Sequence, residues 1–217
     1  MGASSGLRKR SPRRDARAAH AVLTRLAAAG ASGDAKAVGR AARAARRAGL
    51  TRRAVEETAL MLVLYAGYPA ALETLRVVNA VWPGRARRTR EGGVATWRRR
   101  GTALSRRVYG PVHRRLIEAV RGLHPDLAAW MVEEGYGRVL SRRGLAFGVR
   151  EEITVAVLAA LGRERQLVSH LLGAARAGVR AGAIRRALVV GATTRLAVHA
   201  APSAARRAWR SAFPGRR

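Results

Sequence analysis

Residues Arg150 to Leu161 read REEITVAVLAAL, the longest apolar stretch of the chain, and their conformation sets the fold class. The β-branched residues Ile153, Val155 and Val157 favour a strand locally. The length of about three helical turns, the alanine-rich end and the lack of a partner strand favour a helix instead. We therefore predict a buried helix here, within an all-α fold.

Helical signals flank this stretch on both sides. Downstream, segments 164–177 and 181–196 carry apolar residues at helical spacing. Upstream, Asp34 and Thr51 are suitable N-caps for two helices, the first ending at Gly49 and the second at Gly67-Tyr68-Pro69. Further helices are expected over 16–30 and 69–82 and near Pro111 and Pro125, with a glycine-punctuated loop from Gly135 to Gly144.

Two basic segments interrupt this pattern. Residues 1–15 hold Gly, Ser, Pro and Arg without apolar periodicity, which is typical of a disordered basic tail. Residues 83–110 contain Pro83-Gly84, Gly92-Gly93 and two arginine runs, and we interpret them as a basic linker with little fixed structure. The linker divides the helical chain into a first part, 16–82, and a second part, 111–217.

The two parts show a weak internal repeat. A shift of 129 residues places Ala45, Ala48 and Gly49 on Ala174, Ala177 and Gly178. The shared pattern is a helix of small residues, a glycine stop and then an apolar helix. We therefore expect two degenerate copies of one helical unit.

Composition restricts the classes of function. The chain has 217 residues, no cysteine and a formal net charge of +30. Only Lys9 and Lys36 are lysines among the 43 basic residues, a bias that a phosphate-binding surface has no reason to show. We expect no specific nucleic-acid partner, only weak and non-specific polyanion binding. The absence of a signal sequence or membrane-length apolar run predicts a cytoplasmic protein without a membrane partner.

The second part resembles the core of the carboxymuconolactone decarboxylase family. The resemblance rests on Arg150 to Leu158, on Gln166-Leu167-Val168-Ser169-His170 and on Gly173-Ala174 with Gly178. Glu134 to Leu140 looks like the segment before this core in double-repeat members, and Tyr65 to Leu72 like the family's helix-breaking turn. The resemblance implies an all-α, alkylhydroperoxidase D (AhpD)-like fold of two tandem degenerate repeats packed as one unit. It also implies a cofactor-free site and a homo-oligomer, a trimer or hexamer.

The same resemblance assigns roles to residues. The peroxidase branch of the fold uses two cysteines and a histidine on one helix, with a glutamate on the preceding helix. Here Arg163 and Gln166 stand at the cysteine positions, whereas His170 and Glu151 keep the other two. Thiol peroxidase chemistry is therefore excluded, and the decarboxylase branch is the nearer analogy. The first repeat has Ala41 at the place of His170, so we expect it to contribute only walls.

The predicted chemistry is acid–base catalysis without a cofactor. Arg163, Gln166 and His170 are spaced three and four apart and so share one helix face. A carboxylate at Glu151 can orient the His170 imidazole, and the pair can move a proton as carbon dioxide leaves a carboxylated lactone or a related small organic acid. The expected substrate-binding residues are Gln166, Arg163 as the cation for a carboxylate, Tyr136 and Tyr65.

Each assignment has a structural alternative. His170 is also compatible with a buried histidine that makes one hydrogen bond, and Glu151 with a residue that stabilises a helix N-terminus. Gln166 can cap backbone groups, Arg163 can be solvated, and both tyrosines can be core residues. The other histidines lack ligand spacing, so no metal site is expected. Two rival functions remain: a non-catalytic family member with a structural or binding role, and a basic nucleic-acid-associated protein.

Overall fold

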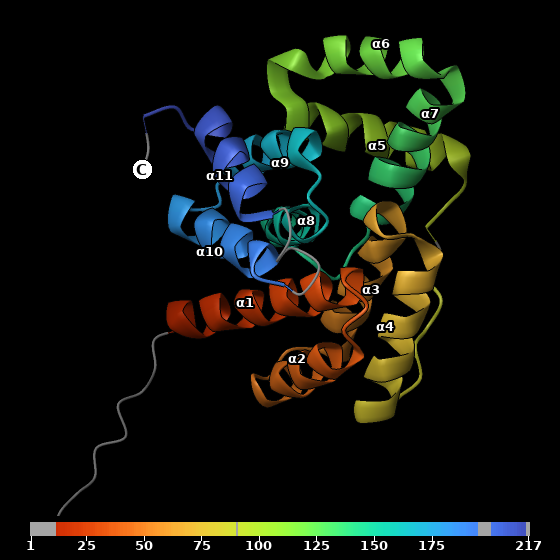
Figure 1. Cartoon of the computed structure of the whole chain (residues 1–217). Coiled ribbons are helices and arrows are strands. Elements are labelled where there is room, and N and C mark those ends of the chain that lie inside the picture. Colours follow the sequence, from red (N-terminus) through yellow and green to blue (C-terminus); the bar gives the residue numbers. More distant parts are fainter. Residues whose placement is uncertain (1–11, 90, 195–200, 216–217) are drawn as a thin grey trace, which may run out of the picture.

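The computed structural model describes residues 12–89, 91–194 and 201–215, and all regular structure within these ranges is helical (Figure 1). The all-α prediction is confirmed. The first unit comprises α1 (Pro12–Ala31), α2 (Ala35–Arg47), α3 (Arg52–Tyr65) and α4 (Gly67–Val81). Asp34 and Thr51 cap α2 and α3 as predicted, because their side chains accept hydrogen bonds from Ala37 N and Ala54 N.

A second group of helices connects the two units. It consists of α5 (Val94–Tyr109), the 3₁₀ turn η1 (Gly110–Val112), α6 (His113–Leu123), α7 (Pro125–Trp130) and the π-helix η2 (Met131–Leu140). The linker prediction for 83–110 is therefore wrong over α5, and the predicted loop from Gly135 is wrong over η2. Packing explains both errors: a Cβ at Gly101 or Gly137 would overlap the backbone of the opposite helix, so glycine lets α5 and η2 lie in backbone contact.

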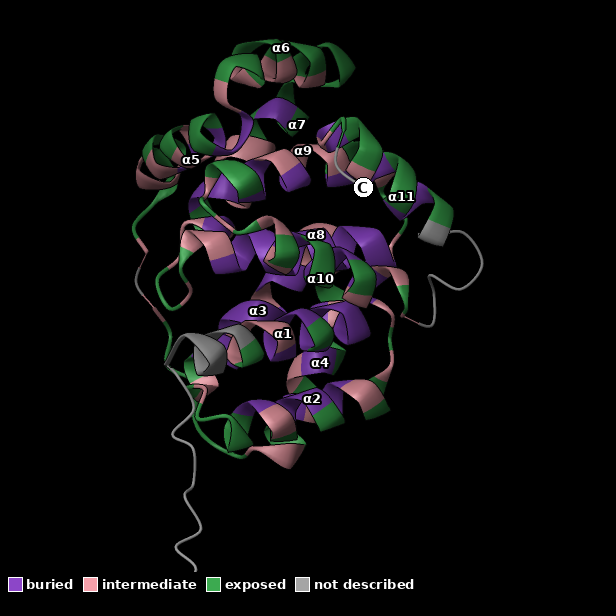
Figure 2. Cartoon of the chain, turned by 90° about the vertical axis from the view of Figure 1, so that its left-hand side faces the viewer, coloured by how far each residue is buried: buried purple, intermediate pink, exposed green. Residues whose placement is uncertain are grey.

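The last unit is built on α8 (Phe147–Ala160), which confirms that the apolar stretch is helical. Every residue from Val149 to Ala160 is buried, and Figure 2 shows α8 as the most continuously buried helix. A helix that is apolar nearly all round belongs in the centre of a protein. Figure 1 accordingly looks almost along α8, with α1, α9 (Glu164–Arg176), α10 (Ala181–Ala192) and α11 (Ala201–Ala212) around it.

The helix bounds follow the repeat. A shift of 129 residues moves α2 onto α9 and the start of α3 onto the start of α10. The stops Gly49 and Gly178 both have positive φ, 72° and 77°, which a glycine adopts without strain. The packing pairs also correspond: α1 contacts α2, α3 and α4, as α8 contacts α9, α10 and α11. Helix α1 further packs on α8 and α10, which joins the two units into one body.

The chain ends differ from the prediction where they are described. Helix α1 begins at Pro12 rather than at residue 16, so the predicted disordered tail does not extend to Asp15. Residues 1–11 lie outside the described residues, as do 195–200, beyond the end of α10. Among the described helices, none combines the length and the apolar character needed to span a bilayer.

Candidate active site

The predicted acid–base pair is formed. His170 Nδ1 lies 3.0 Å from Glu151 Oε2, and the two side chains are 6% and 2% exposed. An ionised carboxylate only accepts hydrogen bonds, so Nδ1 carries the proton and donates it to Glu151. This tautomer leaves Nε2 as the nitrogen that can exchange a proton with a ligand. His170 points inward from α9, and Glu151 faces it from α8.

Gly173 makes room for this pair. It follows His170 by three residues on α9, where an added Cβ would lie 2.7 Å from Glu151 Oε2 and 2.9 Å from Val108 Cγ1. Both distances are shorter than real Cβ contacts. The absence of a side chain at Gly173 therefore lets α5, α8 and α9 converge on the Glu151 carboxylate.

Three tyrosines surround the pair. The rings of Tyr65 and Tyr109 stand edge-on to the His170 ring, at centroid distances of 6.3 and 6.4 Å. The Tyr136 hydroxyl donates to the Tyr109 hydroxyl at 2.7 Å, and the Tyr65 hydroxyl lies 3.0 Å from Thr154 Oγ1. The Tyr109 oxygen accepts the Tyr136 proton, so its own proton is available to a ligand or a neighbour.

Burial keeps these tyrosines neutral. It raises the pKa of Tyr65, Tyr109 and Tyr136, and the nearby Glu151 carboxylate raises all three further. Neutral phenols donate hydrogen bonds and add no negative charge beside the carboxylate. The site is thus one acid–base pair lined by neutral hydrogen-bond donors.

A buried cation, Arg150, lies near one of the three tyrosines, Tyr65. The Arg150 side chain is 2% exposed, and its Nη2 donates to Glu57 Oε2 at 3.1 Å and to the Arg142 carbonyl at 2.7 Å. Arg142 pairs with the same Glu57 carboxylate at 3.0 Å, so two arginines share one buried acid. Arg150 Nε and Nη1 have no hydrogen-bond partner among the described residues. Burial lowers the pKa of Arg150, which remains a cation near neutral pH, and its charge acts on Tyr65.

Two predicted substrate-binding residues are not at the site. Gln166 and Arg163 are both exposed, so the predictions that Gln166 shares a wall with His170 and that Arg163 is the local cation are wrong. The buried stripe of α9 follows Leu167, Leu171 and Ala174. Gln166 falls outside this stripe, and Arg163 precedes the helix as its N-cap. By contrast, Tyr65 and Tyr136 do lie beside the pair, as expected.

The sequence missed Tyr109, Arg150 and Gly173 as parts of this site. Tyr109 was hidden in the presumed linker, although Val108-Tyr109 before Gly110-Pro111 is an apolar helix end that could have signalled it. Arg150 adjoins Glu151, but a buried arginine has no distinct signal in such an arginine-rich chain. The sequence shows Gly173 only as part of the family-like motif and gives no sign that three helices meet there.

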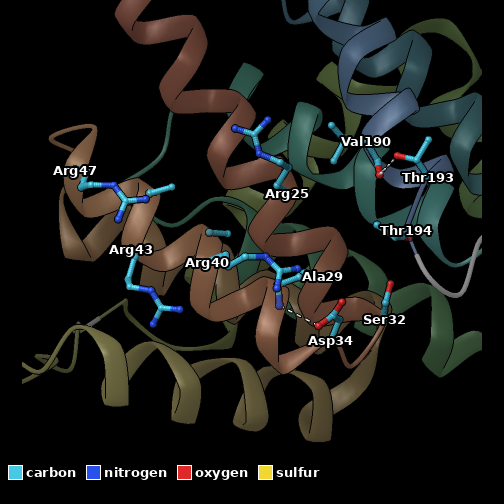
Figure 3. Close-up of a pocket in the computed structure, with 13 residues that line it drawn as sticks. Arg25, Ala29, Ser32, Asp34, Arg40, Arg43, Arg47, Val190, Thr193 and Thr194 are labelled. Atoms are coloured by element: carbon cyan, nitrogen blue, oxygen red, sulfur yellow. Dashed lines mark hydrogen bonds between the residues drawn. The ribbon is translucent and has the colours of Figure 1, made fainter.

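Four cavities formed by the described residues lie away from the pair, because neither Glu151 nor His170 lines them. One of them, here called the arginine groove, has a volume of about 750 Å³ and is lined by Arg25 of α1 and by Arg40, Arg43 and Arg47 of α2 (Figure 3). Spacings of three and four put the α2 arginines on one face. Because the side chains of His170 and Glu151 are only 6% and 2% exposed, a ligand reaches the pair only if the surrounding side chains move.

Residues 125–210 match the sequence profile of the carboxymuconolactone decarboxylase family. No curated protein sequence matches the chain significantly. The matching range spans α7 to α11 and contains the Glu151–His170 pair, Tyr136 and Gly173, whereas Tyr65 and Tyr109 lie outside it. The part of the chain that carries the acid–base pair is therefore the part that is similar to the carboxymuconolactone decarboxylase family.

Proposed function

We propose that this protein is a cofactor-independent, decarboxylase-like enzyme that acts by acid–base chemistry on a carboxylated lactone or a related small organic acid. One observation carries the proposal: the 3.0 Å hydrogen bond between Glu151 and His170, buried within the family-matching segment. A carboxylate that orients a histidine and supports its imidazolium form is a suitable proton shuttle.

The proposed reaction has two steps. The bond between the ring carbon and the carboxylate breaks, carbon dioxide leaves, and the electron pair delocalises into the lactone carbonyl as an enolate. The Tyr109 hydroxyl donates a hydrogen bond to the enolate oxygen. His170, as the imidazolium, then delivers a proton from Nε2 to carbon, and it regains a proton from solvent before the next turnover.

Arg150, rather than Arg163, supplies the cation for the substrate carboxylate. Its Nε and Nη1 are buried without a hydrogen-bond partner among the described residues, and a single Glu57 carboxylate does not balance the charges of Arg150 and Arg142. A buried guanidinium with unused N–H groups is suited to a substrate carboxylate. Arg150 thus binds the charged end of the substrate, and the Glu151–His170 pair handles the proton.

The enclosure of the pair favours one alternative, a non-catalytic family member with a binding or structural role. In that case the Glu151–His170 hydrogen bond only stabilises the core. The two functions differ in one measurable property, namely turnover.

The test is release of carbon dioxide from 4-carboxymuconolactone by the purified full chain. The wild type is expected to turn over, His170→Ala to lower kcat by about 10²–10⁴-fold, and Glu151→Gln to lower it as well. His124→Ala is the matched control. His124 is exposed and caps α7, so its replacement is expected to leave kcat unchanged. Full turnover by a folded His170→Ala variant would overturn the mechanism. A wild type inactive on carboxylated lactones and related acids would favour the non-catalytic role.

A further inference from the structure

A second histidine–glutamate pair lies on another side of α8. His20 Nδ1 of α1 is 3.2 Å from Glu152 Oε1, and the side chains are 36% and 11% exposed. Consecutive helical residues point about 100° apart, so Glu151 faces α9 while Glu152 faces α1. Unlike the enclosed Glu151–His170 pair, this pair is partly open to solvent, on the side of His20.

The pair lines a cavity of about 670 Å³, here called the His20 cavity. Its walls come from α1, the beginning of α8 and the turn between α9 and α10. They are mostly small and apolar, with alanines and valines such as Ala146, Val149 and Val179. The cavity therefore combines a compact apolar wall with one polar pair, a lining typical of small-molecule sites.

Two cations complete the cavity. Arg180 and Arg186 line it, and neither makes an ion pair with the described part of the chain. Glu152, the one acidic residue in the lining, is already hydrogen-bonded to His20. The charge of the two guanidinium groups therefore remains available to an anion.

The backbone adds to this positive character. The cavity lining includes the starts of α8 and α10, at Ala146 and Arg180, and neither helix has a side-chain cap. Free N–H groups and the positive ends of two helix dipoles thus face the same region as the two arginines.

We propose that the His20 cavity binds a small organic hydroxycarboxylate, independently of the Glu151–His170 site. Arg180 and Arg186 hold the carboxylates. Glu152 accepts a hydrogen bond from the hydroxyl group of the ligand, and His20 keeps the Glu152 carboxylate in place. The apolar walls take the carbon chain. The arginine groove also offers cations, but no histidine lines it and its one acidic residue, Asp34, already caps α2.

The experiment follows the imidazole signals of the full chain by NMR, with malate, succinate and inorganic phosphate as probes. Assignment uses the signal lost in His20→Gln. Malate is expected to shift the His20 signal saturably and to bind more tightly than succinate, which lacks the hydroxyl group. Arg180→Ala and Arg186→Ala should each weaken malate binding by about 10-fold. Glu152→Gln should reduce the preference for malate over succinate.

Two controls separate the possible outcomes. Arg43→Ala removes the same charge from the arginine groove and is expected to leave malate affinity at this site unchanged. His170→Ala should also leave it unchanged, so a failed decarboxylase proposal does not affect this test. The proposal is overturned if malate leaves the His20 signal unmoved. It is overturned equally if phosphate, succinate and malate bind alike and Arg43→Ala weakens them as much as Arg180→Ala does.

Discussion

Replacing Gly173 by alanine perturbs the acid–base pair without changing any of its polar atoms. Ordinary van der Waals contact begins near 3.4 Å, but the new methyl group would meet Glu151 Oε2 at 2.7 Å and Val108 Cγ1 at 2.9 Å. The Glu151 carboxylate is buried and cannot swing into solvent. It must retreat by several tenths of an ångström, which stretches its 3.0 Å hydrogen bond to His170.

The magnitude follows from three effects. Overpacking of a close-packed interior costs about 1–3 kcal/mol, and loss of a buried hydrogen bond to a charged group costs about 1.5–3 kcal/mol. Alanine in place of glycine favours a helix by about 1 kcal/mol. Because the two costs outweigh the gain, we expect Gly173→Ala to lower the free energy of unfolding by about 1.5–5 kcal/mol.

Gly122→Ala is the matched control. Gly122 lies near the end of α6, and an added Cβ meets no atom within 4 Å, so this variant should be as stable as the wild type or more so. Urea denaturation measures both variants, and the NMR signal of His170 reports on the pair. If Gly173→Ala is as stable as the wild type and leaves the His170 signal unmoved, the close packing of α5, α8 and α9 around the carboxylate is refuted.

Four further predictions concern charge and assembly. Glu57→Gln leaves Arg142 and Arg150 without their shared counter-charge and should destabilise the fold by about 3 kcal/mol. The control Glu118→Gln, in an exposed ion pair, should cost less than about 1 kcal/mol, and equal losses in urea denaturation would contradict this prediction. Raised pKa values of the three buried tyrosines mean that their contribution to stability is complete below pH 10.0 and decreases as pH rises beyond it. In a Tyr68→Phe variant, which removes the exposed phenol, phenolate absorbance that grows while the fold persists would argue against this. DNA affinity should be independent of sequence and fall steeply as the salt concentration rises. Alanine at the four arginine positions of the arginine groove should flatten the slope of log affinity against log salt concentration by up to about 4. Sequence-selective binding at physiological salt would show a true nucleic-acid partner. We expect a trimer or larger assembly, since Trp130 is 59% exposed and Leu72 is 62% exposed; a monomer mass by light scattering would count against it.

The sequence was most informative where local rules act. Asp34 and Thr51 cap their helices because a short acceptor side chain before a helix satisfies a free N–H group whatever the rest of the fold does. The Arg150–Leu161 stretch forms a helix despite its β-branched residues, because its burial on all sides outweighs local preference. Length and context, rather than propensity, predicted that outcome.

The sequence was least informative where distant backbones meet. Residues 94–109 read as a linker because arginines hide the apolar face of α5, yet Gly101 packs directly on η2. The face of α9 is another example, because spacing alone grouped Gln166 with His170, whereas the neighbouring helices bury the stripe centred on Leu167 and Leu171. Periodicity gives the direction of a side chain relative to its own helix, but only the packing shows which directions are covered.

The burial of α8 on all sides limits how this protein can be divided. A fragment cut at the family-matching boundaries, residues 125–210, would keep Glu151 and His170 but would lose α1, α3 and α5. The faces of α8 and α9 that these helices cover would then be exposed as apolar surface. The matching segment is thus recognisable by its sequence but is not an autonomous folding module, because residues that precede it in the chain complete its interior.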